Sequence, residues 1–599
     1  MIRNNFVFFV VLLVLEGIFT LKLQAATDLE RIVVTRYSVQ DSGYGVVSAA
    51  LDQDDIKKIP AQTPEDLVTY LGGDVQTRGS YGVKSDISLN ASNFQQVLIL
   101  VNGVRVKDPQ TAHHDLDLFF NMEDIERVEV IPAASSSIYG PDGSGGAINF
   151  ILKKPKKKKN TVTLSGGNDE TFEEKLNIFY SLKGVNNSLS ASHASSNGYS
   201  YDTDYKTDTF FHSSAFEDDA MDVYFDAGFN QKEFGAYDFY TPGSNLPSKE
   251  WTDTKFFNLR GNLKNEAFAF SPRFLFRKHH DKFMLDITRP SYFLNHTDTQ
   301  VNEEGGELKF SFLNIETVLG ADYGEESMVS DSLGKHFRSH WDIYLSPTFE
   351  ISEKTKLITT LRQDDYSTFN GEWTGSASLK HILNESMNGF VSLGRTIRVP
   401  TFTELYYSDP TTAGDPDLKP EHAYHLEAGL DKKIRKNVEV SCSFFVRQEY
   451  DTIDFTKMTP ADAKFIARNI SHATTHGLNL YGQWRMNEKT AFDARYLFAN
   501  KRAKSDGLIY KYGINYLKHM VNIGYNQVLS FGSNRLDFIV KKKPGRKEWV
   551  LVNDRLSWKA QKNCEVFLEV YNLFNVNYEE IVGIPQAGRQ IKVGTTFKW

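Results

Sequence analysis

The sequence predicts an all-β transmembrane barrel of about 22 antiparallel strands, with an N-terminal α+β domain folded inside its lumen as a plug. Three observations lead to this prediction. Long segments after residue 160 alternate apolar and polar side chains, the chain ends on such a segment, and the residues before 160 follow a different pattern. We therefore divide the chain into four regions: a signal peptide (1–25), a short N-terminal segment with a linker (26–40), the plug domain (41–158) and the transmembrane barrel (159–599).

The composition limits the class of protein. At 599 residues the chain exceeds the usual size of one compact domain. The mean hydropathy is −0.40, and the sequence contains no run of about 18 apolar residues, which excludes a helical membrane protein. The 43 Phe and 28 Tyr would suit the aromatic girdles of a membrane barrel, although a large soluble β-protein also fits the composition. The net charge of −8 argues against a nucleic-acid binder.

Residues 1–25 have the layout of a secretory signal peptide. Arg3 precedes an apolar run over 6–15, and small residues follow near a cleavage site after Ala25 or Ala26. A membrane anchor is the alternative, but Glu16 and Lys22 interrupt the apolar stretch before it is long enough to span a bilayer. We therefore expect the mature protein to be exported.

The segment 41–158 mixes short strand patterns with turn signals. The apolar run 97–101 ends at Asn102-Gly103, which predicts a buried strand entering a tight turn. Further strands are expected at 128–131 and 147–151. The glycine-rich stretch between them, GPDGSGG, lacks the Lys-Ser/Thr ending of a phosphate loop, so we interpret its glycines as turn formers. The lysine-rich tract 153–159 is expected to be a linker close to anionic lipid headgroups.

From residue 160 onward, long strands of period two are expected. In 438–447, 564–570 and 591–599 one face is apolar and the other is polar or charged. Such strands suit a barrel whose apolar face meets lipid and whose closure leaves no unpaired edge. About 440 residues at about 20 per strand and connection give roughly 22 strands, the size at which the lumen is normally plugged. The terminal Trp599 fits a final barrel strand, and Cys442 and Cys564 fall on the lipid-facing side.

Several motifs in the expected order make the chain resemble a TonB-dependent receptor over essentially all of its mature length. The motifs are ERIVVTR (30–36), VLILVNGVRVKDPQTAHHDLDL (97–118), IERVEV (125–130), SSIYGPDGSGGAINFI (136–151), RVPTFTELYY (398–407), DPDLKPEHAYHLEAGL (415–430) and VYNLFNVNYEE (570–580). The resemblance implies a cell outer-membrane location and active uptake of a scarce ligand, with neither enzymatic activity nor a cofactor. The members it resembles most take up cobalamin, and iron-siderophore receptors come second.

The resemblance also implies partners. The segment ERIVVTR (30–36) resembles the TonB box, which TonB of the inner-membrane complex binds. The β-branched run 32–35 is suited to adding a strand to an exposed sheet edge of that partner. The expected TonB-binding residues are Glu30, Arg31, Ile32, Val33, Val34 and Thr35. An ordinary first strand of the plug is the alternative interpretation. Other expected partners are outer-membrane lipids and a small ligand such as cobalamin or a ferric siderophore, with no nucleic acid; we expect a monomer.

Polar residues on the plug and in expected loops are candidates for ligand contact. They are His113, His114, Tyr237, His279, His280, Asp281 and His296. Imidazole binds transition metals, but adjacent side chains on an extended segment point to opposite faces, so neither neighbouring histidine pair is expected to chelate an ion. We therefore expect hydrogen bonding or loop packing rather than a metal site.

The sequence departs from the family where the plug meets the barrel. Two family arginines that are thought to pair with barrel glutamates are replaced by Asn90 and Pro132, whereas Glu404 and Glu421 remain. A buried carboxylate without a cation is costly. The hypothesis is that Arg78 or Arg105 of the plug compensates in part.

Other functions remain open at this point. Uptake of an oligosaccharide or another nutrient would use the same architecture. A passive porin would lack the box and the plug. A secreted carbohydrate-active enzyme could use Asp364 and Asp365, but adjacent carboxylates diverge in a strand, and no nucleophile–base constellation accompanies them.

Overall fold

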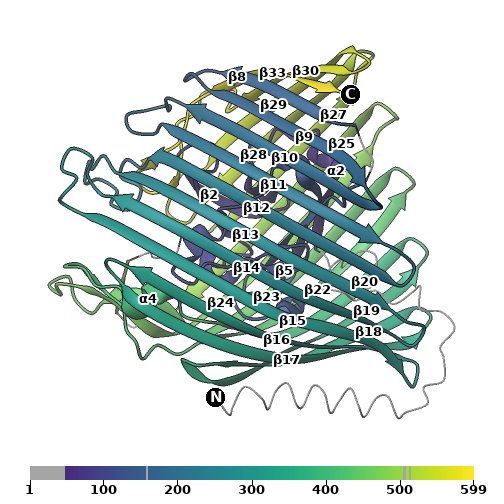
Figure 1. Cartoon of the computed structure of the whole chain (residues 1–599), viewed down its shortest axis with the longest axis horizontal. Helices are drawn as coiled ribbons and strands as arrows, with labels where there is room; N and C mark the ends of the chain where they lie inside the picture. Colours follow the sequence, from purple (N-terminus) through teal and green to yellow (C-terminus); the bar gives the residue numbers. More distant parts are fainter. Residues whose placement is uncertain (1–47, 157–158, 504–506, 512–514) are drawn as a thin grey trace.

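The computed structural model describes residues 48–599 apart from 157–158, 504–506 and 512–514, so the predicted signal peptide and the predicted TonB box lie outside the described residues. A barrel of 22 antiparallel strands encloses the N-terminal plug in this part of the chain, as predicted (Figure 1). The last strand pairs with the first, Phe597 opposite Val162, which closes the barrel. In the described residues, no helix is both long and apolar enough to cross a membrane.

The barrel wall is formed by strands of up to 21 residues. They are β8 (Thr161–Gly167), β9 (Phe172–Leu182), β10 (Val185–Ser196), β11 (Tyr205–Glu217), β12 (Met221–Gly235), β13 (Lys249–Lys264), β14 (Phe268–Met284), β15 (Leu294–Phe312), β16 (Ile315–Ser330), β17 (Gly334–Ser352), β18 (Thr355–Tyr366), β19 (Phe369–Asn384), β20 (Met387–Arg398), β22 (Glu421–Arg435), β23 (Val438–Lys457), β24 (Phe465–Arg485), β25 (Thr490–Ala503), β27 (His519–Val528), β28 (Gly532–Lys542), β29 (Trp549–Gln561), β30 (Cys564–Tyr571) and β33 (Gln590–Lys598). Short elements decorate the rim: α4 (Phe402–Tyr406), β21 (Thr412–Ala413), β26 (Ile509–Tyr510), β31 (Glu579–Ile581) and β32 (Ile584–Pro585).

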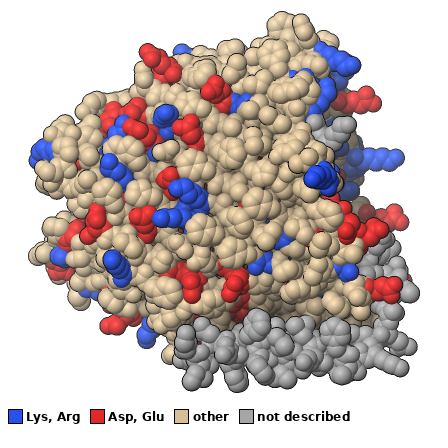
Figure 2. Space-filling model, viewed as in Figure 1, with Lys and Arg blue, Asp and Glu red and all other residues tan. Residues whose placement is uncertain are grey.

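The period-two pattern places apolar side chains on the outer surface. In β33, Val593 and Phe597 are about half exposed, whereas Lys592, which precedes Val593, faces the lumen and is buried. Figure 2 shows the charged side chains gathered toward the two ends of the visible face, with a mostly uncharged surface between them. Cys442 is exposed on this outer side, and both cysteines are free. The exposed apolar band is what a lipid-facing wall requires.

The plug is built on a five-stranded mixed sheet with strand order β1-β6-β7-β4-β5. Its elements are β1 (Ala49–Asp52), α2 (Gln53–Ile56), η2 (Pro64–Asp66), α3 (Leu67–Tyr70), β2 (Asp74–Arg78), β3 (Lys84–Ser88), η3 (Phe94–Gln96), β4 (Val97–Val101), β5 (Val104–Arg105), η4 (Ala112–His114), η5 (Met122–Asp124), β6 (Ile125–Ile131), η6 (Ala133–Tyr139) and β7 (Gly146–Leu152). The three strands predicted in this segment are β4, β6 and β7. Asn102 and Gly103 join β4 to β5 with φ of +51° and +77°, the tight turn expected of this dipeptide.

The plug packs closely against the barrel wall. Phe119 stacks on Phe256 of β13 with ring centroids 3.7 Å apart. On the neighbouring strand, a Cβ at Gly228 would lie 2.5 Å from the Phe119 ring, so this close approach requires glycine. The GPDGSGG loop also docks on the wall, because Asp142 N donates to Ile397 O at 2.7 Å. Gly140 and Gly146 of this loop have φ of +103° and +119°, which agrees with the turns that the sequence indicated, whereas the docking on the wall was not predicted.

Candidate functional site

The two rims of the barrel differ in the length of their connections. One rim has turns as short as two residues, such as 183–184 and 436–437, together with the C-terminus. The other rim carries long loops, including 236–248, 399–420 and 572–589, and lies on the left of Figure 1 beside α4. Outer-membrane barrels have short periplasmic turns and longer extracellular loops. The long-loop rim is therefore the extracellular one.

Two of these extracellular loops fold over the tip of the plug, residues 79–83. Phe239 of loop 236–248 and Ile584 of loop 572–589 are buried in one apolar cluster with Val83 of the plug. Tyr81 stacks on Tyr205 with centroids 5.4 Å apart. The plug tip is thus covered from outside, and a ligand entering the lumen would meet these loops first.

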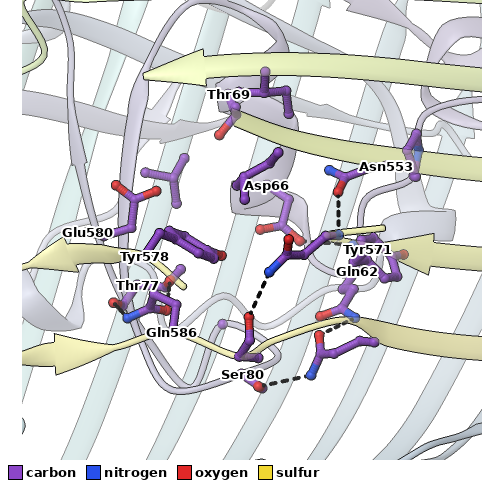
Figure 3. Close-up of a pocket in the computed structure, with 18 of the residues that line it drawn as sticks. Gln62, Asp66, Thr69, Thr77, Ser80, Asn553, Tyr571, Tyr578, Glu580 and Gln586 are labelled. Atoms are coloured by element: carbon purple, nitrogen blue, oxygen red, sulfur yellow. Dashed lines mark hydrogen bonds between the residues drawn. The ribbon is translucent and has the colours of Figure 1, made fainter. Parts of the chain in front are cut away.

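A cavity of about 150 Å³ lies beneath loop 572–589, between the plug tip and strands β28 to β30 (Figure 3). Aromatic rings and neutral hydrogen-bonding groups make up much of its lining: Tyr70, Tyr81, Tyr571, Tyr578, Gln62, Gln586, Gln590, Asn553, Ser80, Thr69 and Thr77. None of these residues was among the candidates expected from sequence.

The amides of the lining connect the loop to the plug. Gln586 Nε2 donates to Thr77 O at 3.0 Å, and Thr77 Oγ1 donates back to Gln586 Oε1 at 2.8 Å. Gln590 Nε2 donates to Ser80 Oγ at 3.2 Å. A ligand group that enters here can exchange hydrogen bonds with the same side chains that hold the plug tip to the wall.

The described lining of the cavity offers no free cation, and its two carboxyl groups, Asp66 and Glu580, already have partners: Asp66 accepts from the backbone nitrogens of Gln62 and Thr63. Lys541, the one cation among the described residues that line it, lies 2.8 Å from Glu580 and 3.4 Å from Asp74. A buried cation paired in this way offers little attraction to a further anion. The cavity is therefore a site for neutral polar groups rather than for a polyanion.

The neighbouring histidines of the plug do not lie on an extended segment, as the sequence interpretation assumed, but on the short helix η4. His113 Nδ1 lies 2.6 Å from Asp86, and its ring stacks on Phe94 at 4.3 Å. Burial opposes ionisation of Asp86, yet Arg78 at 2.7 Å holds the pKa of this carboxyl below its usual range. Burial lowers the pKa of the His113 imidazole.

His114 points instead toward the barrel, where it meets two of the other candidates. His114 and His279 have ring centroids 4.3 Å apart, and His114 Nε2 lies 3.9 Å from Asp281. The sequence analysis expected His279 and Asp281 in a loop, but both lie in strand β14. The period-two pattern of this strand, rather than loop composition, turns both side chains into the lumen.

The remaining candidates do not join this cluster. His280 and His296 lie in β14 and β15, again not in loops, and stack on each other at 6.2 Å on the outer side of the wall. Tyr237 does lie in the loop 236–248, where its hydroxyl donates to Asn245 at 3.1 Å. The histidines at 280 and 296 are therefore on the wrong side of the wall for a lumenal ligand.

The barrel carboxylates expected to lack a cation have one within the barrel itself. Arg398 Nη1 donates to Glu404 at 2.9 Å, and Arg398 Nη2 donates to Glu421 at 2.7 Å. The plug adds a neutral group, because Gln96 Nε2 donates to Glu421 at 2.8 Å and to Glu449 at 3.0 Å. The two glutamates that were expected to hold the plug, Glu404 and Glu421, are therefore bound by Arg398 of the barrel, and Glu421 is also bound by Gln96 of the plug.

The hypothesis that a plug arginine compensates is therefore wrong. Arg78 pairs with Asp86 inside the plug at 2.7 Å, and Arg105 lies 3.9 Å from Asp142. Asn90 does reach the wall, where it accepts a hydrogen bond from Asn479 at 3.3 Å. Arg398 was visible in the motif RVPTFTELYY, whereas nothing in the sequence around Gln96 marked it as a partner of two glutamates.

Comparison with known proteins identifies both parts of the chain. Residues 137–573 match the TonB dependent receptor-like β-barrel family, and residues 38–147 match the TonB-dependent receptor plug domain. The chain is 23% identical over 479 residues to "Vitamin B12 transporter BtuB" of Vibrio vulnificus (strain YJ016), with 75% of each chain covered. It is 20% identical over 590 residues to the protein of that name from Photobacterium profundum, with 93% of each covered.

Solved structures share the fold at low identity. The siderophore receptor PirA from Pseudomonas aeruginosa matches with a TM-score of 0.73 and 17% identity, over 92% of this chain and 99% of that one. The copper transporter OprC matches with a TM-score of 0.78 and 16% identity over the same shares. Together with the barrel, the plug and the family matches, these comparisons lead to one conclusion: the chain belongs to the TonB-dependent receptors, outer-membrane transporters that take up small ligands and are not enzymes.

Proposed function

We propose that this receptor imports a corrinoid of the cobalamin type, and that the cavity beneath loop 572–589 binds part of it. The observation that supports this is a lining rich in amides and tyrosines, among them Gln62, Asn553 and Gln586, whose one described cation, Lys541, is already paired with Glu580. A corrinoid presents amide side chains around an apolar macrocycle, whereas a ferric catecholate siderophore carries negative charge that would find no free cation here.

The cavity fits part of such a ligand. Pockets for whole drug-sized ligands usually have volumes of about 300–1,000 Å³, and this one measures about 150 Å³. An edge of the ligand would enter the cavity while the extracellular loops contact the remainder. The curated relatives named as vitamin B12 transporters support the same ligand class. A ferric siderophore is the comparison ligand, because the related structures include siderophore receptors.

The binding experiment uses purified full-length protein in detergent, titrated with cyanocobalamin and separately with a ferric catecholate siderophore. We expect saturable binding of cyanocobalamin and a loss of about tenfold or more in affinity for Gln586→Ala, because buried partners would be left unpaired. Gln561→Ala is the matched control: Gln561 is exposed at the periplasmic end of β29. Binding of the siderophore alone would contradict the corrinoid assignment.

Energy coupling is proposed to use the TonB box at residues 30–35, which lie outside the described residues. Proline cannot donate its backbone nitrogen to an added strand. Val33→Pro should therefore abolish uptake of labelled ligand into cells while leaving binding to the cell surface close to normal. Unchanged uptake would show that this segment is only structural.

A further inference from the structure

A group of ionisable side chains is buried where η4 of the plug meets strands β13 and β14, and the proposed uptake uses none of them. His114 and Asp117 come from the plug, and His279 comes from the wall. All three are almost fully buried, and His279 has no exposed surface. The group therefore joins the two domains on the extracellular side of the lumen.

The three side chains converge on one point. One potential ligand atom from each lies within 4.8 Å of the other two. His114 Nδ1 is 3.0 Å and His279 Nε2 is 3.8 Å from the same oxygen, Asp117 Oδ2. In a tetrahedral site with metal–ligand bonds of about 2.0–2.1 Å, ligand atoms lie about 3.3–3.4 Å apart. The observed separations lie on either side of that value, so small side-chain shifts would complete the geometry.

His279 is oriented as a metal ligand would be. Its Nδ1 lies 2.8 Å from Thr254 Oγ1, and its Nε2 has no hydrogen-bond partner among the described residues. When Nδ1–H donates to the threonine, Nε2 keeps its lone pair toward His114 and Asp117. Metal-binding histidines commonly have their second nitrogen fixed by such an outer hydrogen bond. Without an ion, a buried and unpaired nitrogen is costly.

His114 Nδ1 lies close to both a hydrogen-bond donor and an acceptor, and it cannot form hydrogen bonds to both at once. Its Nδ1 lies 3.0 Å from Lys84 Nζ and also 3.0 Å from Asp117 Oδ2. The ammonium requires Nδ1 to accept, whereas the carboxylate requires it to donate. One nitrogen cannot do both at once. Lys84 has another partner in Glu250 at 2.9 Å, so it can release His114.

Among the described charged side chains around this group, each of the three cations is paired with a carboxylate other than Asp281. Two of the cations have partners across the plug–wall boundary, Arg277 with Asp108 at 2.6 Å and Lys232 with Asp117 at 2.9 Å. Asp281 lies 3.9 Å from His114, and its Oδ1 has no hydrogen-bond partner among the described residues. A cation bound beside Asp281 would supply this buried carboxylate with an opposite charge.

We propose that His114, Asp117 and His279 bind a divalent ion of the first transition row, with Asp281 beside them balancing its charge, and that the ion clips the plug to the barrel wall. Two imidazoles and a carboxylate favour Zn²⁺, Ni²⁺ or Cu²⁺ over Mg²⁺ or Ca²⁺. The earlier expectation rejected chelation by adjacent histidines; this site uses His114 and His279, which are 165 positions apart. It is independent of the ligand proposed above.

The experiment uses full-length protein in detergent, stripped with chelator and titrated with Zn²⁺ by calorimetry. We expect one Zn²⁺ per chain in a background that carries His280→Ala and His296→Ala, which removes the outward-facing histidine pair. In the same background, His279→Ala should weaken binding by at least about tenfold. The background protein is itself the matched control, since His280 adjoins His279 on the strand but faces outward.

Two further measurements keep the test decisive. If His279→Ala does not fold, His279→Gln retains a side chain that can bond to Thr254, and the absorption bands of tetrahedral Co²⁺ in the unmutated protein report the site directly. The pair Lys84→Met with Glu250→Gln removes the competing ammonium without stranding its carboxylate and should tighten Zn²⁺ binding. Absence of Zn²⁺ binding, or full binding by folded His279→Ala or His279→Gln, would overturn the proposal and leave a purely protonic plug–wall contact.

Discussion

The strands of the plug and the strands of the barrel are made from similar apolar residues but meet different surroundings. In β4 of the plug, all five side chains from Val97 to Val101 are buried, so the run is apolar throughout. In β33 of the barrel, Val593 is exposed to lipid and Lys592 is buried in the lumen. A strand covered on both faces gives a continuous apolar run, whereas a strand between two media alternates.

The boundary between the two regions combines apolar contacts, such as Phe119 on Phe256, with buried ion pairs. The plug core is apolar, but across the plug–wall boundary Lys84 pairs with Glu250 and Arg277 pairs with Asp108, all four buried. Buried ion pairs add little net stability compared with apolar packing, although breaking one leaves a costly charge. Such a boundary fixes the plug's orientation while allowing it to separate from the wall more easily than an apolar core would.

The largest effect should come from a charge in the plug core. Phe150 has no exposed surface, and Phe150→Asp would bury an unpaired carboxylate, which we expect to destabilise the plug by more than about 4 kcal/mol. The barrel should still form, because its strands pair with each other. Limited proteolysis of the plug and heat-dependent mobility of the barrel on gels measure the two separately, with Phe150→Leu as the control. A protease-resistant plug in Phe150→Asp would show that the two regions are not distinct.

A charge on the outer barrel face should have a smaller effect that depends on depth. Leu393 is exposed at the middle of β20, and Leu393→Arg should cost about 2–4 kcal/mol in a bilayer. Leu383, near the periplasmic end of β19, is the matched control, since Leu383→Arg should cost no more than about 1 kcal/mol. Urea unfolding in lipid vesicles measures both. Equal costs at the two positions would contradict a lipid-facing wall.

Removal of the Gln96 side-chain amide should weaken the contact between plug and barrel, by less than the substitutions above. Gln96→Leu deletes hydrogen bonds to two buried carboxylates, Glu421 and Glu449, and should cost about 1.5–3 kcal/mol. Gln95→Leu, at the preceding half-buried residue, is the control. Release of the plug by denaturant, followed through a fluorophore on the plug, gives the comparison. Identical midpoints would mean that barrel cations hold the two glutamates without Gln96, Arg398 at Glu421 and Lys501 at Glu449.

The smallest expected effect, for a change of one pH unit, is on the free energy of unfolding of the plug. Burial raises the pKa of Glu65 from 4.5 to about 8, so the folded plug binds this proton more tightly than the unfolded chain does. The resulting stability is fully present below about pH 4.5 and is lost as pH rises toward 8, with a slope of at most about 1.4 kcal/mol per pH unit. Urea titrations at several pH values should show this slope reduced in Glu65→Gln and unchanged in Glu126→Gln, a solvent-exposed control. A slope that persists in Glu65→Gln would assign it to another group.

Much of the architecture followed from local patterns. The period-two segments predicted the barrel, and the turn at Asn102-Gly103 with the apolar runs beside it predicted three plug strands. Site residues were harder to predict from the sequence. His114 was a candidate, but the sequence did not place it on a helix, and it did not indicate that His279 and Asp281 lie on a strand facing the lumen. A histidine within a long strand is hard to distinguish from one in a loop when the strand also carries polar residues on its lumenal face.

The sequence by itself determined the class of fold, the membrane location and the family, because alternation, turns and motifs are properties of neighbouring residues. Only the tertiary structure decided which side chains meet. Lys84 and Glu250 are 166 positions apart, and Gln96 and Glu421 are 325 apart. Such contacts depend on how the plug is rotated within the barrel and on the register of every strand in the wall. Short-range patterns specify each strand, but the packing of the whole chain specifies its partners.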